Sequence, residues 1–376
     1  MRKGKTVFLK VPKIQKDLVS VTVFGPGFGE SIVIYIPYLG WGIIDSCLYK
    51  VKGNTINPAL EYLKSENVTH LSFLIITHPH RDHFQGLNLI IDHFLGQIDR
   101  ICYYSGDGIR EYRIFLAKKH ILREPGLVEL ANIFKKFAQA KKAGAHIVNI
   151  SERTEIVRRD KYEHQEVEII ALSPSEDSVK RYVQLLHEAI SLQGRDFLSE
   201  INDREHNLLS SAILCKIGDL SLIFGSDLEI GDNKYMGWKG VMRNPDSPDL
   251  AAHFVKVPHH GSENAFYEPV WKEFSKNNSP ISVITPYDRA FDPLPRIKII
   301  RKIANFSNTI AITAKTKTVS PNKIYDGKIV KNLHGVKSWR YLVKPDQIGC
   351  VKLSLSPCNG DISNIDLIKP AYIWSQ

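Results

Sequence analysis

Three histidines and an aspartate lie within six residues of each other in the segment His78-Pro79-His80-Arg81-Asp82-His83. Neutral imidazole and carboxylate groups are the ligands that divalent ions such as zinc prefer. The segment follows an apolar run at 71–76, which predicts a short buried strand. A strand end holds side chains on a rigid element and leaves coordination positions open to water. The pattern favours a metal site over its alternative, a solvated polar loop.

Two later apolar runs also end in residues of the ligand type. The run at 220–224 ends at Gly225-Ser226-Asp227, and the run at 253–257 ends at Pro258-His259-His260-Gly261-Ser262. Alone, Asp227 would pass for an ordinary turn residue. We expect His259 to be a metal ligand and His260 to face the substrate, but neighbouring residues at a strand end point in different directions, so the sequence leaves the opposite assignment open.

The elements that must position these residues alternate between strands and helices. Periodicity predicts strands at 19–24, 32–36, 101–104, 146–150, 167–172, 212–216, 281–285 and 309–313, and helices at 57–66, 86–94, 109–120, 126–142, 177–192, 265–276 and 296–305. Glycines at 25–29 separate two strands and precede no helix, which favours a tight hairpin over a phosphate-binding loop. The fold class is therefore α/β.

The spacing His-x-His-x-Asp-His resembles the signature of the metallo-β-lactamase superfamily. The resemblance implies a four-layer αββα fold, which we expect to carry a β-rich C-terminal appendage. It also implies one metal on His78 and His80, a second on Asp82 and His83, a bridge between them from Asp227, and support of the metal loops by Asp45. Lactamases, thioesterases, lactonases, phosphodiesterases and nucleases share this signature, so it does not specify the substrate.

The order of the motifs resembles one branch in particular, the hydrolase domain of the competence DNA-uptake channel proteins and their soluble relatives. The shared features are the glycine loop with Glu30-Ser31, the Ser173-Pro174 pair, Asn207, Asp227 and the His-His-Gly-Ser motif. That branch often lacks a histidine in the middle of the chain, the usual third ligand of the first metal. His206 is the candidate replacement here, with a plain polar role as the alternative; Asn207 and Ser262 are lesser candidate site residues.

Positive charge is concentrated after these motifs. Between residues 296 and 345 twelve Lys or Arg face one acid, Asp326, a local net charge of +11, whereas the whole chain carries +10. The twelve are Arg296, Lys298, Arg301, Lys302, Lys315, Lys317, Lys323, Lys328, Lys331, Lys337, Arg340 and Lys344. Such a segment attracts polyanions and predicts nucleic acid as a partner. A solvated surface, or contact with an acidic protein or a second copy of the chain, is the alternative.

Length and composition suit a large apolar core. The chain has 376 residues, 43% of them hydrophobic, and we expect a hydrolase domain at 1–315, with a helical insertion near 105–145, and a basic β-rich extension at 316–376. The five cysteines are scattered and form no Cys-x-x-Cys pair, which is typical of reduced thiols. With no apolar run of membrane length and no export signal, the sequence predicts a cytoplasmic protein without a membrane partner.

Together these features predict a metal-dependent hydrolase that holds two divalent ions, Zn²⁺ or Mn²⁺. Asp82 would orient the attacking water and His260 would contact the substrate. The basic segment and the branch resemblance favour phosphodiester bonds of DNA or RNA, hence a nuclease or phosphodiesterase. The alternatives are hydrolysis of a small ester, cyclic nucleotide or lactone, and a catalytically weakened subunit that binds nucleic acid or a partner within a larger system, such as a defence assembly.

Overall fold

The computed structural model describes residues 11–51, 53–106, 125–162, 165–191, 203–289, 293–316, 337, 339–342, 349–368 and 370–374. The predicted helix at 109–120 and five of the twelve basic residues at 296–345 lie outside this described part.

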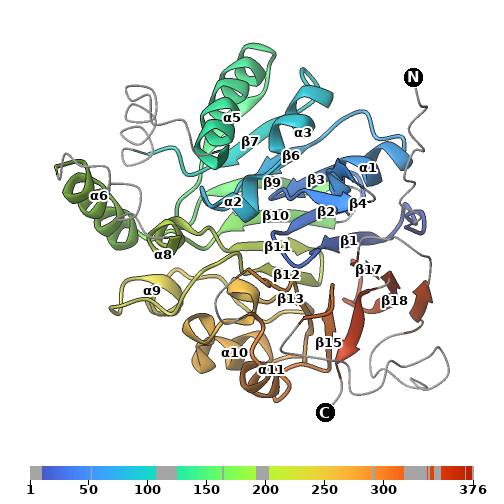
Figure 1. Cartoon of the computed structure of the whole chain (residues 1–376). Coiled ribbons are helices and arrows are strands. Elements are labelled where there is room, and N and C mark those ends of the chain that lie inside the picture. Colours follow the sequence, from blue (N-terminus) through green and yellow to red (C-terminus); the bar gives the residue numbers. More distant parts are fainter. Residues whose placement is uncertain are drawn as a thin grey trace.

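Two large mixed β-sheets form the centre of the molecule (Figure 1). The first has the strand order β16-β18-β17-β1-β2-β3-β6-β7-β8. Its strands are β1 (Val19–Phe24), β2 (Ser31–Ile36), β3 (Gly40–Ile44), β6 (Phe73–Ile75), β7 (Arg100–Tyr103), β8 (His146–Asn149), β16 (Trp339–Leu342), β17 (Cys350–Leu355) and β18 (Ile362–Ile368). Strands β3, β6, β7 and β8 are parallel, and their carboxyl ends lie at one edge of the sheet. The segment 77–83, here called the metal loop because it carries the predicted ligands, begins at this edge.

The second sheet has the order β19-β15-β14-β13-β12-β11-β10-β9. Its strands are β9 (Glu155–Tyr162), β10 (Gln165–Ala171), β11 (Ile213–Ile217), β12 (Leu220–Phe224), β13 (Phe254–Lys256), β14 (Ile281–Ile284), β15 (Thr309–Ile312) and β19 (Tyr372–Trp374). Strands β12 to β15 are parallel, so the segments after β12 and β13 leave the sheet at the same edge. A short hairpin, β4 (Tyr49–Val51) with β5 (Asn54–Ile56), stands apart.

The two sheets and the helices outside them form four layers, and an apolar core lies between each pair of neighbouring layers. Between the two sheets lies a cluster that includes Val21, Ile75, Leu222 and Phe254. The outer face of the first sheet is covered by α1 (Pro58–Ser65), α3 (Leu87–His93) and α5 (Pro125–Lys142), and that of the second by α9 (Gly237–Arg243), α10 (Glu268–Phe274) and α11 (Ile297–Ile303). The predicted four-layer αββα class is therefore confirmed.

The part of the chain that the structure describes contains three further short or peripheral helices and three 3-10 turns. They are α2 (Arg81–Phe84), α6 (Glu176–Ser191), α8 (Asp203–His206) and the 3-10 turns η1 (Asn207–Leu209), η2 (Pro258–Gly261) and η3 (Glu263–Ala265). The sequence pattern predicted neither β9 nor α9. No helix in the described ranges is long and apolar enough to cross a membrane.

The described part of the C-terminal region is β-rich, as predicted, and its strands extend both sheets. Strand β17 pairs along its length with β1, and β19 pairs with β15. The two chain ends are also joined by a buried lysine, because Lys352 Nζ donates a hydrogen bond to the carbonyl of Pro12.

Candidate metal centre

The predicted ligands come together where the two sheets meet. His78 follows β6, His80 precedes α2, and Asp82 and His83 lie on α2. From the second sheet, Asp227 follows β12. Carboxyl ends of parallel strands are the usual location of sites in α/β proteins, because loops from neighbouring strands converge there.

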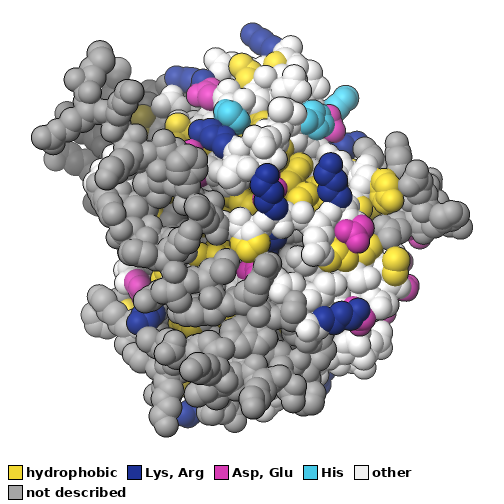
Figure 2. Space-filling model, turned by 90° about the vertical axis from the view of Figure 1, so that its right-hand side faces the viewer, with side chains coloured by type: hydrophobic (Ala, Val, Ile, Leu, Met, Phe, Trp, Pro, Cys, Tyr) yellow, Lys and Arg dark blue, Asp and Glu magenta, His cyan; other side chains and the backbone are white. Residues whose placement is uncertain are grey.

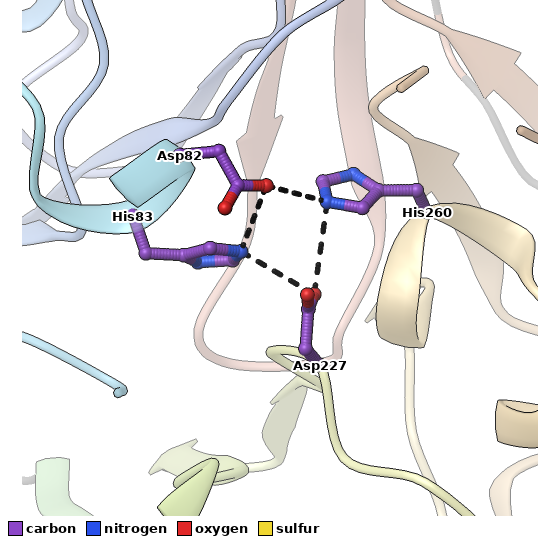
Figure 3. A group of neighbouring side chains, drawn as sticks. All are labelled: Asp82, His83, Asp227 and His260. Atoms are coloured by element: carbon purple, nitrogen blue, oxygen red, sulfur yellow. Dashed lines mark hydrogen bonds and ion pairs between the residues drawn. The ribbon is translucent and has the colours of Figure 1, made fainter. Parts of the chain in front are cut away.

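One group consists of Asp82, His83, Asp227 and His260, and all four are buried (Figure 3). His83 Nε2 lies 3.3 Å from Asp227 Oδ1 and 3.6 Å from Asp82 Oδ2. His260 Nε2 lies 3.1 Å from Asp82 Oδ2 and 3.8 Å from Asp227 Oδ1. Two imidazole nitrogens and two carboxylates thus point into one small space.

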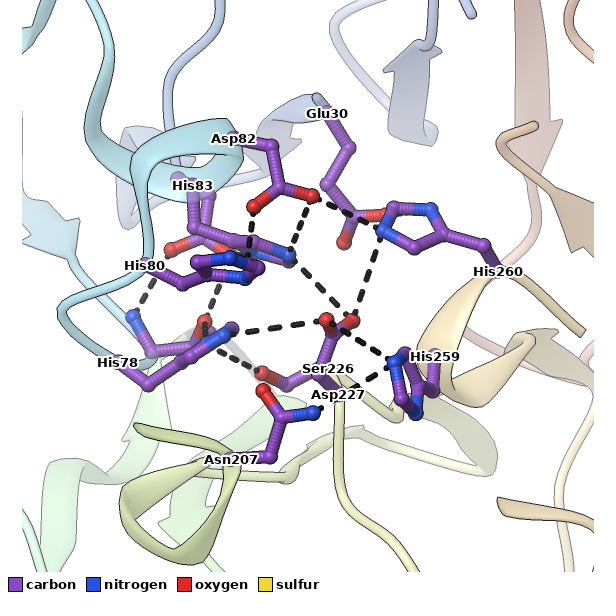
Figure 4. A network of polar contacts seen from close by, with 12 residues as sticks. Glu30, His78, His80, Asp82, His83, Asn207, Ser226, Asp227, His259 and His260 are labelled. Carbon is purple, nitrogen blue, oxygen red and sulfur yellow. Dashed lines mark hydrogen bonds and ion pairs between the residues drawn. The ribbon is translucent and has the colours of Figure 1, made fainter. Parts of the chain in front are cut away.

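A second group shares Asp227 and adds His78 and His80. His78 Nε2 is 3.8 Å from Asp227 Oδ2, the oxygen opposite the one that faces His83 and His260 (Figure 4). His80 Nδ1 lies 2.9 Å from Asp82 Oδ1, so Asp82 also spans the two groups. The two oxygens of Asp227 each face a different set of histidines, an arrangement suited to a bridging carboxylate.

His83 is oriented from behind by Asp45. Asp45 Oδ2 lies 2.7 Å from His83 Nδ1, and the same carboxylate accepts hydrogen bonds from the Thr77 amide at 2.8 Å and its hydroxyl at 2.7 Å. Glu30, Asp45 and His83 form a third group of ligand-type residues. Since Asp45 already accepts these bonds, its contribution is to fix the metal loop and to present His83 Nε2 to the centre.

His260 is oriented in the same manner by a carbonyl. Its Nδ1 lies 2.9 Å from the Thr285 oxygen, and because a carbonyl can only accept, Nδ1 carries the hydrogen and Nε2 faces Asp82. His259 and His260 have left-handed backbones, with φ of 45° and 54°. Such strain in non-glycine residues is concentrated at functional sites.

The pKa values of Asp227 and His78 are both lowered by their surroundings. Burial alone would raise the pKa of Asp227, but His83, His260 and His259 outweigh it and hold this pKa well below its usual range. Burial and the neighbouring His83 lower the pKa of His78 well below its usual range. The carboxylates are thus ionised and the His78 ring is neutral, which are the forms that bind metal.

These residues fit divalent metal ions. His78 Nε2, His83 Nε2 and Asp227 Oδ1 are buried and have no hydrogen bond of good geometry. Buried polar atoms normally have partners, so such atoms clustered within one site point to an ion as the missing partner. The mixed nitrogen and oxygen donor set is the one that zinc and manganese accept.

The adjacent His259 lies outside both groups. Its Nε2 is 3.9 Å from Asp227 Oδ2, and its Nδ1 is 3.4 Å from Glu229 Oε1. Asn207 Nδ2 donates to Glu229 at 3.1 Å and lies 3.5 Å from His259 Nε2. Of the two neighbours, His260 is thus the one whose ring lies against Asp82 and His83, and the left-handed turn sets this orientation.

The two remaining candidates lie off the centre. His206 is buried, and its Nδ1 is 3.3 Å from the Tyr182 hydroxyl. It belongs to no ligand group of the described residues. Ser262 forms a hydrogen bond with Asn264, and its amide donates to the His259 carbonyl at 2.9 Å.

The sequence patterns gave no role to a buried ion pair below His260. Lys256 Nζ lies 2.6 Å from Glu30 Oε2, and both side chains are at most 1% exposed. The Thr285 hydroxyl donates to the same carboxylate oxygen at 2.6 Å. Burial would raise the pKa of Glu30, but Lys256, His83 and His260 together lower it. Lys256 is a charged residue inside the otherwise apolar strand β13. That unusual position is the signal in the sequence that could have revealed the ion pair.

The glycine loop between β1 and β2 forms the predicted hairpin and also supports the metal loop. Gly29 has φ of +80°, and a Cβ there would lie 2.6 Å from the Asp82 carbonyl oxygen. We expect Gly29→Ala to displace this loop and to lower metal affinity about ten-fold or more in a metal titration. Gly144→Ala is the control: its φ is +109°, but nothing lies within 4 Å. Equal loss in both variants would assign the effect to backbone strain alone.

Metal binding should also depend on pH through His83. Burial disfavours its charged form, but Asp227, Asp82 and Asp45 raise its pKa well above the usual range. In metal-free protein the ring is therefore protonated at neutral pH, and a metal must displace that proton. Apparent affinity should rise with pH until this pKa is passed. Calorimetry at pH 7 in two buffers of different ionisation enthalpy should show proton release; proton uptake would contradict the assignment.

Comparison with protein-family models found no match, and neither did comparison with curated proteins. Weak similarity to a number of solved structures was found, including the following three. A mutant of the CmlA beta-hydroxylase has a TM-score of 0.37 and 13% identity, covering 73% of this chain and 46% of that one. A diphosphatase from the PhnP family has a TM-score of 0.36 and 11% identity, covering 76% of this chain and 92% of that one. Unliganded yeast PDE1 has a TM-score of 0.41 and 11% identity, covering 78% of this chain and 96% of that one. No family membership follows from similarities of this size.

Proposed function

We propose that the chain is a metal-dependent hydrolase with a dinuclear centre that cleaves phosphodiester bonds. The observation that carries the proposal is Asp227, whose two buried oxygens face separate sets of histidines. His78 and His80 would hold one ion, and Asp82, His83 and His260 the other, with Asp227 between them. In this proposal His260 would be the ligand in place of His259, which the sequence pattern favoured.

Bound divalent ions supply acidity to water and offset negative charge on a phosphate group. The chain's own residues supply the orientation. Asp82 is held by His80 and His260 and is placed to accept a hydrogen bond from the attacking water. His259 is 17% exposed and lies beside Asp227, so it is placed to contact the substrate in the role first expected of His260.

The beginning of the basic segment lies next to the centre. Pro295 packs so closely on Gly261 that a Cβ there would lie 2.8 Å from the proline Cβ, and Arg296 follows at once. This proximity supports nucleic acid as the substrate and the partner of residues 296–345. Among the residues drawn in colour in Figure 2, the Lys and Arg side chains are scattered over the face and form no single patch.

A small diester is the second candidate substrate. A cavity of about 300 Å³ adjoins the centre through Asn207 and Glu229, and its lining includes Arg181, Glu205, Asp232 and Met236. That volume is at the lower end of small-ligand sites. Its acidic lining suits hydroxyl groups better than a polyanion.

Hydrolysis of bis(p-nitrophenyl) phosphate, single- and double-stranded DNA and RNA, with Mn²⁺, Zn²⁺ or a chelator, tests the proposal. We expect metal-dependent cleavage that Asp82→Ala abolishes. The matched control is Asp99→Asn. The Asp99 side chain is 41% exposed, pairs with His70 and lies just before β7, at the end of that strand opposite the candidate centre. This variant should retain activity. Absence of metal-dependent cleavage of every substrate would refute the phosphodiesterase proposal.

A further inference from the structure

Two loops from opposite sheets join beside the candidate metal centre. The β1–β2 loop carries Phe28, and the segment after β14 carries Tyr287 and Arg289. The Asp288 amide donates to the Gly27 carbonyl at 2.8 Å, and Gly27 and Tyr287 form a parallel bridge. Phe28, Tyr287 and Arg289, here called the aromatic platform, are thus held together by backbone contacts.

The platform adjoins the centre on two sides. The Tyr287 ring lies 5.3 Å from the His260 ring at an interplanar angle of 33°. Next to Phe28, Gly29 packs on the Asp82 carbonyl, and the amide of Glu30 donates to the same oxygen at 3.0 Å. A substrate bound at the centre and extending past His260 would meet these side chains.

The platform combines aromatic surface with one cation. The Phe28 and Tyr287 ring centroids are 5.6 Å apart, and the Arg289 guanidinium lies 3.6 Å from the Phe28 centroid. Arg289 is exposed, and none of the described acidic side chains forms an ion pair with it. An arginine stacked on a ring keeps its N–H edge available for a phosphate.

We propose that the aromatic platform binds the nucleic-acid strand that flanks the scissile phosphodiester, with Arg289 on a backbone phosphate and the rings of Phe28 and Tyr287 against a base. The inference deepens the proposed function and rests on it for the position of the scissile bond. Aromatic rings interleaved with cations are the usual means of binding single strands, because every base has a stacking face. An acidic protein would use Arg289 without needing the rings.

Binding of a fluorescein-labelled, phosphorothioate-linked single-stranded DNA of about twelve nucleotides to the metal-loaded protein tests this inference. Anisotropy would be measured over a range of salt concentrations. We expect Arg289→Ala to weaken binding about five-fold or more and to reduce the slope of log affinity against log salt by about 0.7, the value for one phosphate on a single strand. Arg289→Lys should retain the slope. Phe28→Leu should weaken binding about five-fold and leave the slope unchanged.

The control is Arg243→Ala, since Arg243 also stacks on a ring, that of Tyr235 at 5.1 Å, but on α9. It should match the wild type in affinity and slope, and all variants should retain their metal content. Failure of the wild type to bind, or an Arg289→Ala variant with unchanged affinity and slope, would overturn the inference. An effect of Arg289→Ala without any effect of Phe28→Leu would also overturn it, in favour of an acidic ligand.

The two proposals fail in different ways. Binding that depends on Arg289 and Phe28, together with no cleavage of any diester, would refute the hydrolase and leave the platform standing. Metal-dependent cleavage of bis(p-nitrophenyl) phosphate, together with strand binding that is unchanged by substitution of Arg289 or Phe28, would support the hydrolase and refute the role of the platform.

Discussion

Asp227→Asn should remove the bridge of the candidate centre and with it most of the activity. The amide keeps the shape of the side chain but loses the charge and one of the two oxygens that face His78 on one side and His83 with His260 on the other. We expect metal content to fall from two ions per chain to one or fewer, and phosphodiester hydrolysis to fall more than about a hundred-fold, because outer residues of metal sites alone account for 10- to 100-fold effects.

Elemental analysis and steady-state kinetics of Asp227→Asn, beside Asp99→Asn, measure both effects. Retention of two ions per chain with unchanged kcat would show that Asp227 is an ordinary turn residue. Loss of activity with full metal content would instead limit its role to positioning the substrate.

Lys256→Met should have the largest effect on stability. It leaves the Glu30 carboxylate, only 1% exposed, without its cation, and a buried charge stripped of its partner costs about 3–5 kcal/mol of unfolding free energy. Glu30 would then take up a proton more readily, since burial raises its pKa once Lys256 no longer lowers it. The loss should therefore be greater at high pH than at pH 4.

Chemical unfolding of the single and double variants separates charge from packing. Glu30→Gln combined with Lys256→Met removes both charges and should cost clearly less than Lys256→Met alone. Equal losses would mean that the methylenes of Lys256, and not its charge, stabilise this region. Lys272→Met is the control, because its ion pair with Glu268 is exposed.

The sequence indicated the α/β class and most of the residues that meet at the candidate centre, because both depend on local patterns. Apolar runs that stop at His78 and Asp227 place these residues at strand ends, and parallel pairing of the strands then brings the ends together. The α/β class followed from the alternation of strands and helices, and the four-layer arrangement was what the superfamily resemblance implied. The competence-branch resemblance, the cytoplasmic location and the division at residue 315 remain predictions.

Local patterns could not distinguish His259 from His260. Their orientation depends on a left-handed turn at both residues and on the Thr285 carbonyl of a neighbouring strand end. The pairing of Glu30 with Lys256 could not be predicted for the same reason, because 226 positions separate them and only the packing of the two sheets makes them partners. Long-range contacts of this kind leave no periodic signal in the sequence.

The metal content of the purified protein tests the central claim most directly. Elemental analysis after incubation with excess Zn²⁺ or Mn²⁺ and removal of unbound ions should give two ions per chain, with Asp227 shared between them. One ion per chain would indicate that the group at His78 and His80 is incomplete without a third histidine. None would contradict the hydrolase account and favour a subunit that retains the fold for binding alone.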